Sequence, residues 1–262
     1  MKLCVIHING KNGSEVYTAL IDGVFNRVKQ PGTEITHRYA RLKRASDTIY
    51  AYPYYINSLD VVHRFHEASN DGFDGVMVAC SGDPGVIQGR SVSKIPVVGP
   101  FAAAMHLACE YGLKFGVVTV EDRPWLEAVH TIVDANGMRS RCSGIRSIET
   151  PSKIAFTQGF VDSSGVIADI EKQARRLVDE GANSVILASA GLSCIGAAAA
   201  FTQIPGLGVP VFDVLTIGLK TLEMRVELTT KGGFPVTSRV GLTELQDVAD
   251  TARVKAQFPV QI

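Results

Sequence analysis

The stretch Gly75-Val76-Met77-Val78-Ala79-Cys80-Ser81-Gly82-Asp83-Pro84-Gly85 decides how this sequence folds. Its small and β-branched residues predict a buried strand, and the glycines and proline after them predict a turn. Ligands bind beyond the carboxyl ends of the strands in open α/β sheets, so Cys80 is a candidate site residue. A similar stretch, Ser184-Val185-Ile186-Leu187-Ala188-Ser189-Ala190-Gly191-Leu192, returns later in the chain, and aligning the two strands sets Ser189 opposite Cys80.

Strand and helix signals alternate along the chain in two rounds of the same order. Each round has an opening strand, a central strand with a glycine turn, and a strand led by proline. The predicted strands are 2–9, 33–38, 75–80, 95–99, 114–120, 184–189 and 210–213, and the predicted helices are 14–25, 58–69, 100–112, 124–135 and 162–179. This order predicts an α/β fold of two pseudosymmetric lobes, each with a mainly parallel sheet flanked by helices. We expect 1–112 together with 217–262 to form the first lobe, and 113–216 to form the second.

Composition narrows the classes of function. The chain has 262 residues, with 26 Lys and Arg against 26 Asp and Glu, so no basic excess indicates a nucleic-acid partner. No apolar run reaches the roughly 20 residues of a membrane helix. The apolar run at the N-terminus is too short for a signal peptide, and it is expected to be the first strand. The five cysteines are scattered and form neither a disulfide framework nor a metal motif, which favours a cytoplasmic protein. The pair His63 and His66 lacks further ligands and is expected on a helix surface.

The motifs Ala79–Gly85, Pro96–Gly99 and Val185–Gly191 resemble those of the aspartate/glutamate/hydantoin racemase superfamily, its hydantoin and allantoin racemase branch above all. The resemblance implies an active site in the cleft between the lobes, without metal, pyridoxal phosphate or nicotinamide. It also implies one cysteine per lobe, and these two face opposite sides of a carbon acid. One thiolate removes the α-proton, and the other thiol returns a proton from the opposite face.

By this resemblance Cys80 is the first catalytic cysteine, and Ser189 stands where the second is expected. The first turn of the family is usually Asn-Pro-Asn, whereas this sequence reads Asn9-Gly10-Lys11-Asn12, so only part of that pattern is kept. The residues implied to bind substrate are Asn9, Ser81, Gly82, Asp83, Ala190 and Gly191. Asp83 has a second role to consider, because an aspartate after such a turn commonly caps the next helix.

Ser189 changes the chemistry that is open to this site. A thiol titrates near 8.5 and is readily tuned, whereas a serine hydroxyl needs a dedicated base to become a nucleophile or proton acceptor. Ser189 is therefore suited to holding a substrate oxygen and poorly suited to removing a carbon-bound proton. Three explanations stay open: an introduced substitution, a natural enzyme with one thiol, or another proton donor such as Cys194, which we place in the following helix and not at the strand tip.

Three functions follow from these alternatives. The first is a racemase or epimerase that acts at a carbon acid next to a carbonyl, on a hydantoin-like or amino-acid-like substrate, with Cys80 as acid and base. The second is a decarboxylase, lyase or isomerase with a single thiol. The third is a two-lobed small-molecule binding protein without turnover. A small molecule is the expected partner in each case, and the family resemblance implies a homo-oligomer. The tyrosine group at 50–55 could close over a substrate or pack as a cover between the lobes, and packing is the expectation.

Overall fold

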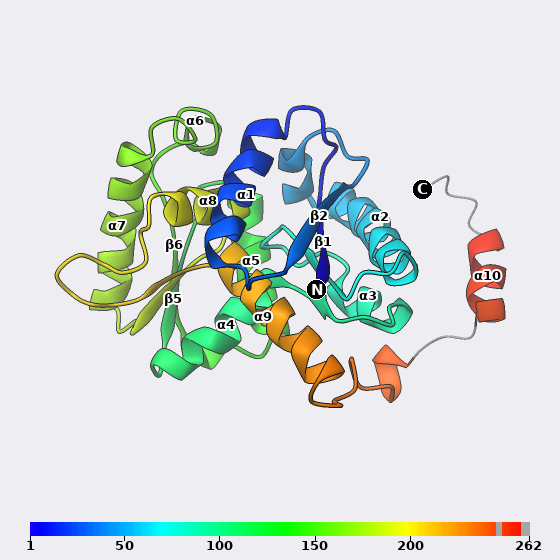
Figure 1. The fold of residues 1–262 in the computed structure, drawn as a ribbon. Coiled ribbons are helices and arrows are strands. Elements are labelled where there is room, and N and C mark those ends of the chain that lie inside the picture. Colours follow the sequence, from blue (N-terminus) through cyan, green and yellow to red (C-terminus); the bar gives the residue numbers. More distant parts are fainter. Residues whose placement is uncertain (245–247, 258–262) are drawn as a thin grey trace.

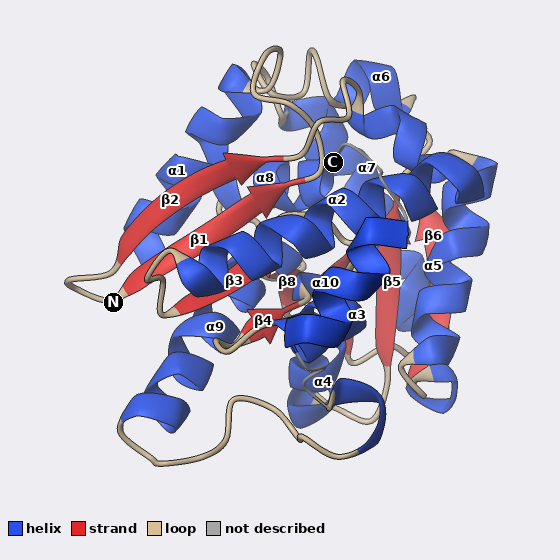
Figure 2. Ribbon diagram, turned by 90° about the vertical axis from the view of Figure 1, so that its right-hand side faces the viewer, coloured by secondary structure: helices blue, strands red, loops and turns tan. Residues whose placement is uncertain are grey.

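Two parallel sheets of four strands form the framework of the computed structural model, which describes residues 1–244 and 248–257. The first sheet has the order β2-β1-β3-β4, and Figure 2 shows these strands side by side. Its strands are β1 (Lys2–His7), β2 (Glu34–Tyr39), β3 (Gly75–Val78) and β4 (Val97–Val98). The second sheet, β6-β5-β7-β8, consists of β5 (Phe115–Thr119), β6 (Cys142–Ser147), β7 (Ser184–Leu187) and β8 (Val211–Asp213). The two strand orders correspond one to one, so the predicted repeat is confirmed.

Helices cover the faces of both sheets (Figure 1). The helices of the first half are α1 (Glu15–Val28), α2 (Ala51–Asn70), α3 (Val86–Val92) and α4 (Pro100–Tyr111). Those of the second half are α5 (Arg123–Ala135), α6 (Ser152–Ala155), α7 (Ser164–Asp179), α8 (Ala190–Ala198), α9 (Val214–Thr230) and α10 (Val248–Gln257). Short 3₁₀ turns occupy Ala45–Ile49, Arg139–Arg141 and Gly241–Thr243. The predicted α/β fold class is therefore confirmed.

Several elements differ from the sequence-based expectation, among them α2, β6 and α9. Helix α2 begins at Ala51 and not near residue 58, because Pro53 lies in its first turn, where a proline costs no helical hydrogen bond. Strand β6 was not expected, because its polar sequence CSGIRS is half-buried throughout and lacks the apolar run of a central strand. Helix α9 was not assigned either, although its buried face carries Leu215, Leu219 and Leu222.

Helices α4 and α9 join the two lobes. Helix α4 follows the first sheet in sequence but contacts β5, β7 and β8, whereas α9 follows the second sheet and contacts β3 and β4. The two helices pack on each other in the middle of the molecule (Figure 1). Their buried residues make one continuous hydrophobic core with both sheets. The lobe bounds 1–112 with 217–262, and 113–216, stay a prediction, and residues 245–247 and 258–262 lie outside the described part.

The described residues contain neither a membrane-spanning helix nor a cluster of metal-ligating side chains. Within 1–244 and 248–257, no helix is long and apolar enough to span a bilayer. The same ranges contain no group of three or more His, Cys, Asp or Glu side chains placed to hold a metal ion.

Candidate active site

Cys80 lies two residues beyond β3, at the carboxyl end of the first sheet. The preceding Ala79 N–H still donates to Ile6 O at 2.8 Å, which holds the chain in line with the sheet. The Cys80 side chain is only 7% exposed, and its Sγ accepts a hydrogen bond of 3.3 Å from the Gly82 N–H. Burial raises the pKa of the Cys80 thiol from 9.0 to about 12, the Gly82 N–H lowers it, and the Asp83 carboxylate raises it further. In this closed arrangement Cys80 is a neutral thiol.

Asp83 fixes the turn to the start of α4. Its carboxylate accepts hydrogen bonds from Phe101 N–H at 3.1 Å and Ala102 N–H at 2.7 Å. The predicted capping role is therefore seen, although the capped helix is α4 and not α3, which comes next in sequence. Gly99 makes this approach possible, since a methyl group on it would lie 2.6 Å from Asp83 Cγ. Asp83 reaches across to α4 because its backbone takes a left-handed conformation, with φ 47°.

Two aromatic side chains from different lobes meet at Gly82. A methyl group on Gly82 would lie 3.0 Å from the Tyr54 ring and 3.5 Å from the Trp125 ring. Tyr54 donates its hydroxyl to Gly82 O at 2.6 Å, and Trp125 donates Nε1 to Thr119 Oγ1 at 2.8 Å. The turn after Cys80 therefore faces the second lobe.

Of the four tyrosines from 50 to 55, Tyr54 alone packs against this turn. Tyr50, Tyr52 and Tyr55 are mainly exposed, so the expectation of a packed cover was wrong for those three.

Ser189 occupies the N-cap position of α8, but its side chain does not cap the helix. It is the residue before the helix, is 8% exposed, and its side chain makes no capping hydrogen bond within the described chain. Its hydroxyl is therefore available to a ligand at the tip of β7. The following Gly191 lies against the ring of Phe156, with which any side chain on Gly191 would overlap. Ala190, between Ser189 and Gly191 in the sequence, is half-buried.

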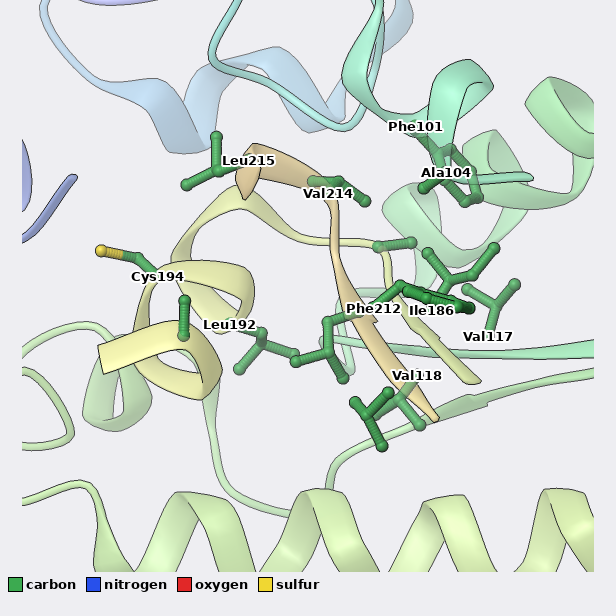
Figure 3. Close-up of a cluster of buried hydrophobic side chains, with 14 of the residues drawn as sticks. Phe101, Ala104, Val117, Val118, Ile186, Leu192, Cys194, Phe212, Val214 and Leu215 are labelled. Atoms are coloured by element: carbon green, nitrogen blue, oxygen red, sulfur yellow. The ribbon is translucent and has the colours of Figure 1, made fainter. Parts of the chain in front are cut away.

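Cys194 lies inside α8, as the sequence predicts. Figure 3 shows its sulfur directed away from the aliphatic cluster around Ile186 and Val117. Burial, followed by the charge of Asp213, raises the pKa of Cys194 to about 12, and the charge of Arg27 lowers it. Asp213 is the last residue of β8 and Arg27 belongs to α1, so the thiol of Cys194 is within range of charges on both elements, and Cys194 itself lies in α8 and not at the tip of β7.

Asn9 is held within its own turn. Its Nδ2 donates to Ser14 Oγ at 2.6 Å and to Gly10 O at 3.3 Å, and Ser14 Oγ donates to Gly10 O at 2.9 Å. This network shapes the loop between β1 and α1. Its predicted role in substrate binding stays a prediction.

Tyr17 is a candidate that the sequence analysis missed. Its hydroxyl is buried without a hydrogen-bond partner in the described residues. Burial raises its pKa well above the usual value, and the thiols of Cys194 and Cys80 raise it further. The Tyr17 hydroxyl is therefore within electrostatic range of both thiols. Its ring stacks on Phe160 of the second lobe at 6.1 Å between centroids. No motif marks Tyr17, because it occupies an ordinary position on an amphipathic helix.

His7 was missed as well, because it reads as the last residue of an apolar strand. Its Nε2 lies 2.7 Å from His37 Nδ1, and His37 Nε2 lies 2.9 Å from Asp22 Oδ1. A carboxylate accepts only, so His37 donates to Asp22 and His7 donates to His37. This order leaves His7 Nδ1 as an acceptor, and it has no partner in the described part of the chain. Burial, together with His37, lowers the pKa of His7 to about 3, so the ring stays neutral.

Ser81 Oγ is a third buried atom of this kind, in a side chain 1% exposed and adjacent to Cys80. An unpaired buried polar group costs about 1–3 kcal/mol. His7 and Ser81 lie at the carboxyl ends of β1 and β3, and the ring of Tyr17 contacts that of His7, so this edge of the first sheet offers unpaired polar atoms to a ligand.

Comparison with known proteins identifies the family of this chain. The family model for Asp/Glu/hydantoin racemase matches residues 5–222. A hydantoin racemase of Pseudomonas sp. (strain NS671) is 30% identical over 232 residues, which cover 88% of both chains.

Two solved structures share the fold. Allantoin racemase from Klebsiella pneumoniae has a TM-score of 0.77 and 26% identity over 94% of both chains. Allantoin racemase from Pseudomonas fluorescens has a TM-score of 0.77 and 23% identity over 94% of this chain and 97% of its own. The expectation of a racemase-type enzyme is confirmed, which removes the alternative of a binding protein without turnover. The chain belongs to the Asp/Glu/hydantoin racemase family.

Proposed function

We propose that this enzyme racemises a carbon acid next to a carbonyl, on a hydantoin-like substrate, with Cys80 as acid and base. The observation that carries the proposal is the Cys80 thiol, held on the Gly82 N–H at the tip of β3 and followed by Ser81, whose buried hydroxyl has no partner in the described residues. The named activity of the relatives, hydantoin and allantoin racemase, supports the substrate class.

The pairing of Tyr17 with His7 supports a cyclic amide. The two rings lie edge to face at 6.0 Å between centroids, and they offer one unpaired donor and one unpaired acceptor. A hydantoin ring carries adjacent N–H and C=O groups, which are the donor and the acceptor that complement this pair. We assign the substrate C=O to Tyr17 Oη and a substrate N–H to His7 Nδ1, while Asp22 and His37 hold the tautomer of His7.

In this proposal the proton moves between Cys80 and the α-carbon. The thiolate removes the α-proton, and the negative charge that develops on the substrate oxygen is stabilised by Tyr17 and by strand-tip N–H groups. Loss of chirality requires that a proton returns from the opposite face. The internal repeat, which aligns Ser189 with Cys80, assigns Ser189 to that face. Its hydroxyl makes no capping hydrogen bond in the described chain, and it holds a substrate oxygen or passes on a proton. Since Cys80 is 7% exposed, the strand tips part to admit the substrate.

Solvent-deuterium exchange tests the role of Cys80. The enzyme is incubated with L- and D-5-substituted hydantoins in D₂O, and α-deuteration is followed by NMR. We expect Cys80→Ala to abolish exchange while its circular dichroism is unchanged. Cys109→Ala, on the half-buried face of α4, is the matched control and keeps full exchange. Full exchange in Cys80→Ala would end the proposal.

One observation favours a second function: the residue at the carboxyl end of β7 is a serine, Ser189. A site with one thiol protonates a carbanion from one face only, which suits decarboxylation of a malonate-type acid. Carbon dioxide release with a single product enantiomer would support this lyase over the racemase. Ser189→Cys separates the two: it raises the racemisation rate if the framework is that of a racemase, and leaves it unchanged if the site is a lyase.

A further inference from the structure

A cavity lies against α4 and α9, and neither Cys80 nor Ser189 lines it. Its volume is about 370 Å³, within the usual range for small-molecule sites. The described residues that line it come from α3, β4, α4, α9 and the end of α5: Arg90, Val98, Gly99, Ala102, Ala103, His106, Leu107, Glu110, Asn136, Thr221, Met224 and Arg225.

Two half-buried arginines face this cavity without an acidic partner. In the described part of the chain, Arg90 makes one hydrogen bond, from Nε to Val97 O at 3.4 Å, and Arg225 makes one, from Nη2 to Val236 O. Neither forms an ion pair there, although most arginines of this chain do. Burial lowers the pKa of Arg225, and the like charge of Arg90 lowers it further, so the two guanidinium groups lie close enough to repel each other.

Such an arrangement is costly unless something negative occupies it. Partial burial removes hydration from both charges, and their repulsion adds to that cost. Each guanidinium keeps N–H donors that no acceptor among the described residues uses, in the fork geometry that binds carboxylates and phosphates. Asp83, whose charge acts on Arg90, is already engaged by the α4 amides, and Glu110, which also lines the cavity, is exposed and forms no ion pair with either arginine in the described residues.

We propose that the cavity between α3, α4 and α9 binds a small organic anion through Arg90 and Arg225. His106, Asn136 and Thr221 supply further polar contacts, and Leu107 with Met224 covers the apolar part of the ligand. A carboxylate and a phosphate share the chemistry that two guanidinium groups recognise. The proposal does not depend on the racemase activity, because none of the catalytic candidates contributes to the cavity.

The cavity also adjoins the turn that carries Cys80. Burial raises the pKa of Asp83 to about 7, the N–H groups of α4 and the charge of Arg90 oppose that rise, and Asp83 connects the end of that turn to α4. An anion at Arg90 therefore acts on a residue three positions from the thiol. If the two sites are coupled, the anion and the substrate alter each other's affinity by the same factor.

Isothermal titration calorimetry at low ionic strength tests the site with two probes, inorganic phosphate and succinate. The variants are Arg225→Gln and Arg90→Gln. The matched control is Arg123→Gln, since Arg123 is 89% exposed and paired with Glu127 at a distant surface. We expect one of the probes to bind the unmodified protein and its dissociation constant to rise at least tenfold in both cavity variants, but not in the control. Which probe binds more tightly distinguishes a phosphate from a dicarboxylate ligand.

Three results would overturn the proposal: no heat from either probe at millimolar concentration, equal affinity in the cavity variants, or loss of an oligomer in Arg225→Gln without any anion binding. The last would assign this face to a second copy of the chain. If both variants fail to fold, phenylglyoxal modification of the unmodified protein decides the matter. Bound anion then protects Arg90 and Arg225 in peptide maps, and unprotected modification refutes the site.

Discussion

The Cys80 thiol is predicted to resist alkylation in the folded enzyme. Its Sγ belongs to a buried apolar cluster with Val78 and Val86, and this burial raises its pKa from 9.0 to about 12. At pH 8 the thiolate fraction is then about 1 in 10⁴, compared with about 1 in 10 for a thiol at the lower pKa. Because only the thiolate reacts, alkylation should be about a thousandfold slower than in the unfolded chain. The 7% exposure slows it further.

Pulsed labelling with iodoacetamide and peptide mass spectrometry measures this rate. The same cysteine in the urea-unfolded chain is the reference, since it carries the same neighbours in sequence. The folded rate should rise about tenfold per pH unit up to pH 10, as expected for a pKa above that range. A folded rate within tenfold of the reference at pH 8, or a plateau below pH 9, would show that the resting thiol is already activated and that our account of its burial is wrong.

Two stability changes follow from close contacts elsewhere. Gly99→Ala should lower the free energy of unfolding by about 1–3 kcal/mol, because its methyl group would lie 2.6 Å from Asp83 Cγ. The control Gly23→Ala, in α1 with open space around it, should raise that free energy by up to about 1 kcal/mol. Glu223→Gln should lower it by about 2–3 kcal/mol, because the fully buried carboxylate accepts from Gln30 N–H, Thr33 Oγ1 and Lys220 Nζ. Urea denaturation measures all three, and midpoints equal to wild type would contradict the packing described.

The repeat of strands was predictable because each central strand is a short apolar run that ends in small residues. The glycines after Cys80 and Ser189 predict the two turns from local sequence alone. Strand β6 was not predictable in the same way, since an edge strand needs no apolar face and Arg146 within it is partly exposed. The start of α2 was misjudged because Pro53 reads as a breaker unless its place in the first turn is known.

The candidate site was predictable only where a local motif marks it. Cys80, Gly82 and Asp83 share one turn, and Asp83 was recognised as a cap, although the helix it caps starts well beyond the turn. Tyr17 and His7 carry no motif, because their significance lies in unpaired atoms that exist only after β1, β2 and α1 have packed. Trp125 likewise reaches Gly82 from the other lobe. Contacts between distant segments therefore set the limit of the sequence-based prediction.

The last prediction separates function from stability at Tyr17. Its hydroxyl is buried and has no partner within the described chain, so Tyr17→Phe removes an unsatisfied group and keeps the ring that stacks on Phe160. The free energy of unfolding should therefore stay equal or rise, by up to about 1–3 kcal/mol, while the exchange rate falls at least tenfold through loss of a hydrogen bond to the developing oxyanion. The matched control is Tyr54→Phe, which breaks a bond of 2.6 Å to Gly82 O and should lower stability. Urea denaturation and α-deuteration are measured on the same samples. Tyr17→Phe with lower stability and full exchange would show that the hydroxyl serves the fold, and the donor assigned to the substrate carbonyl would have to be found elsewhere.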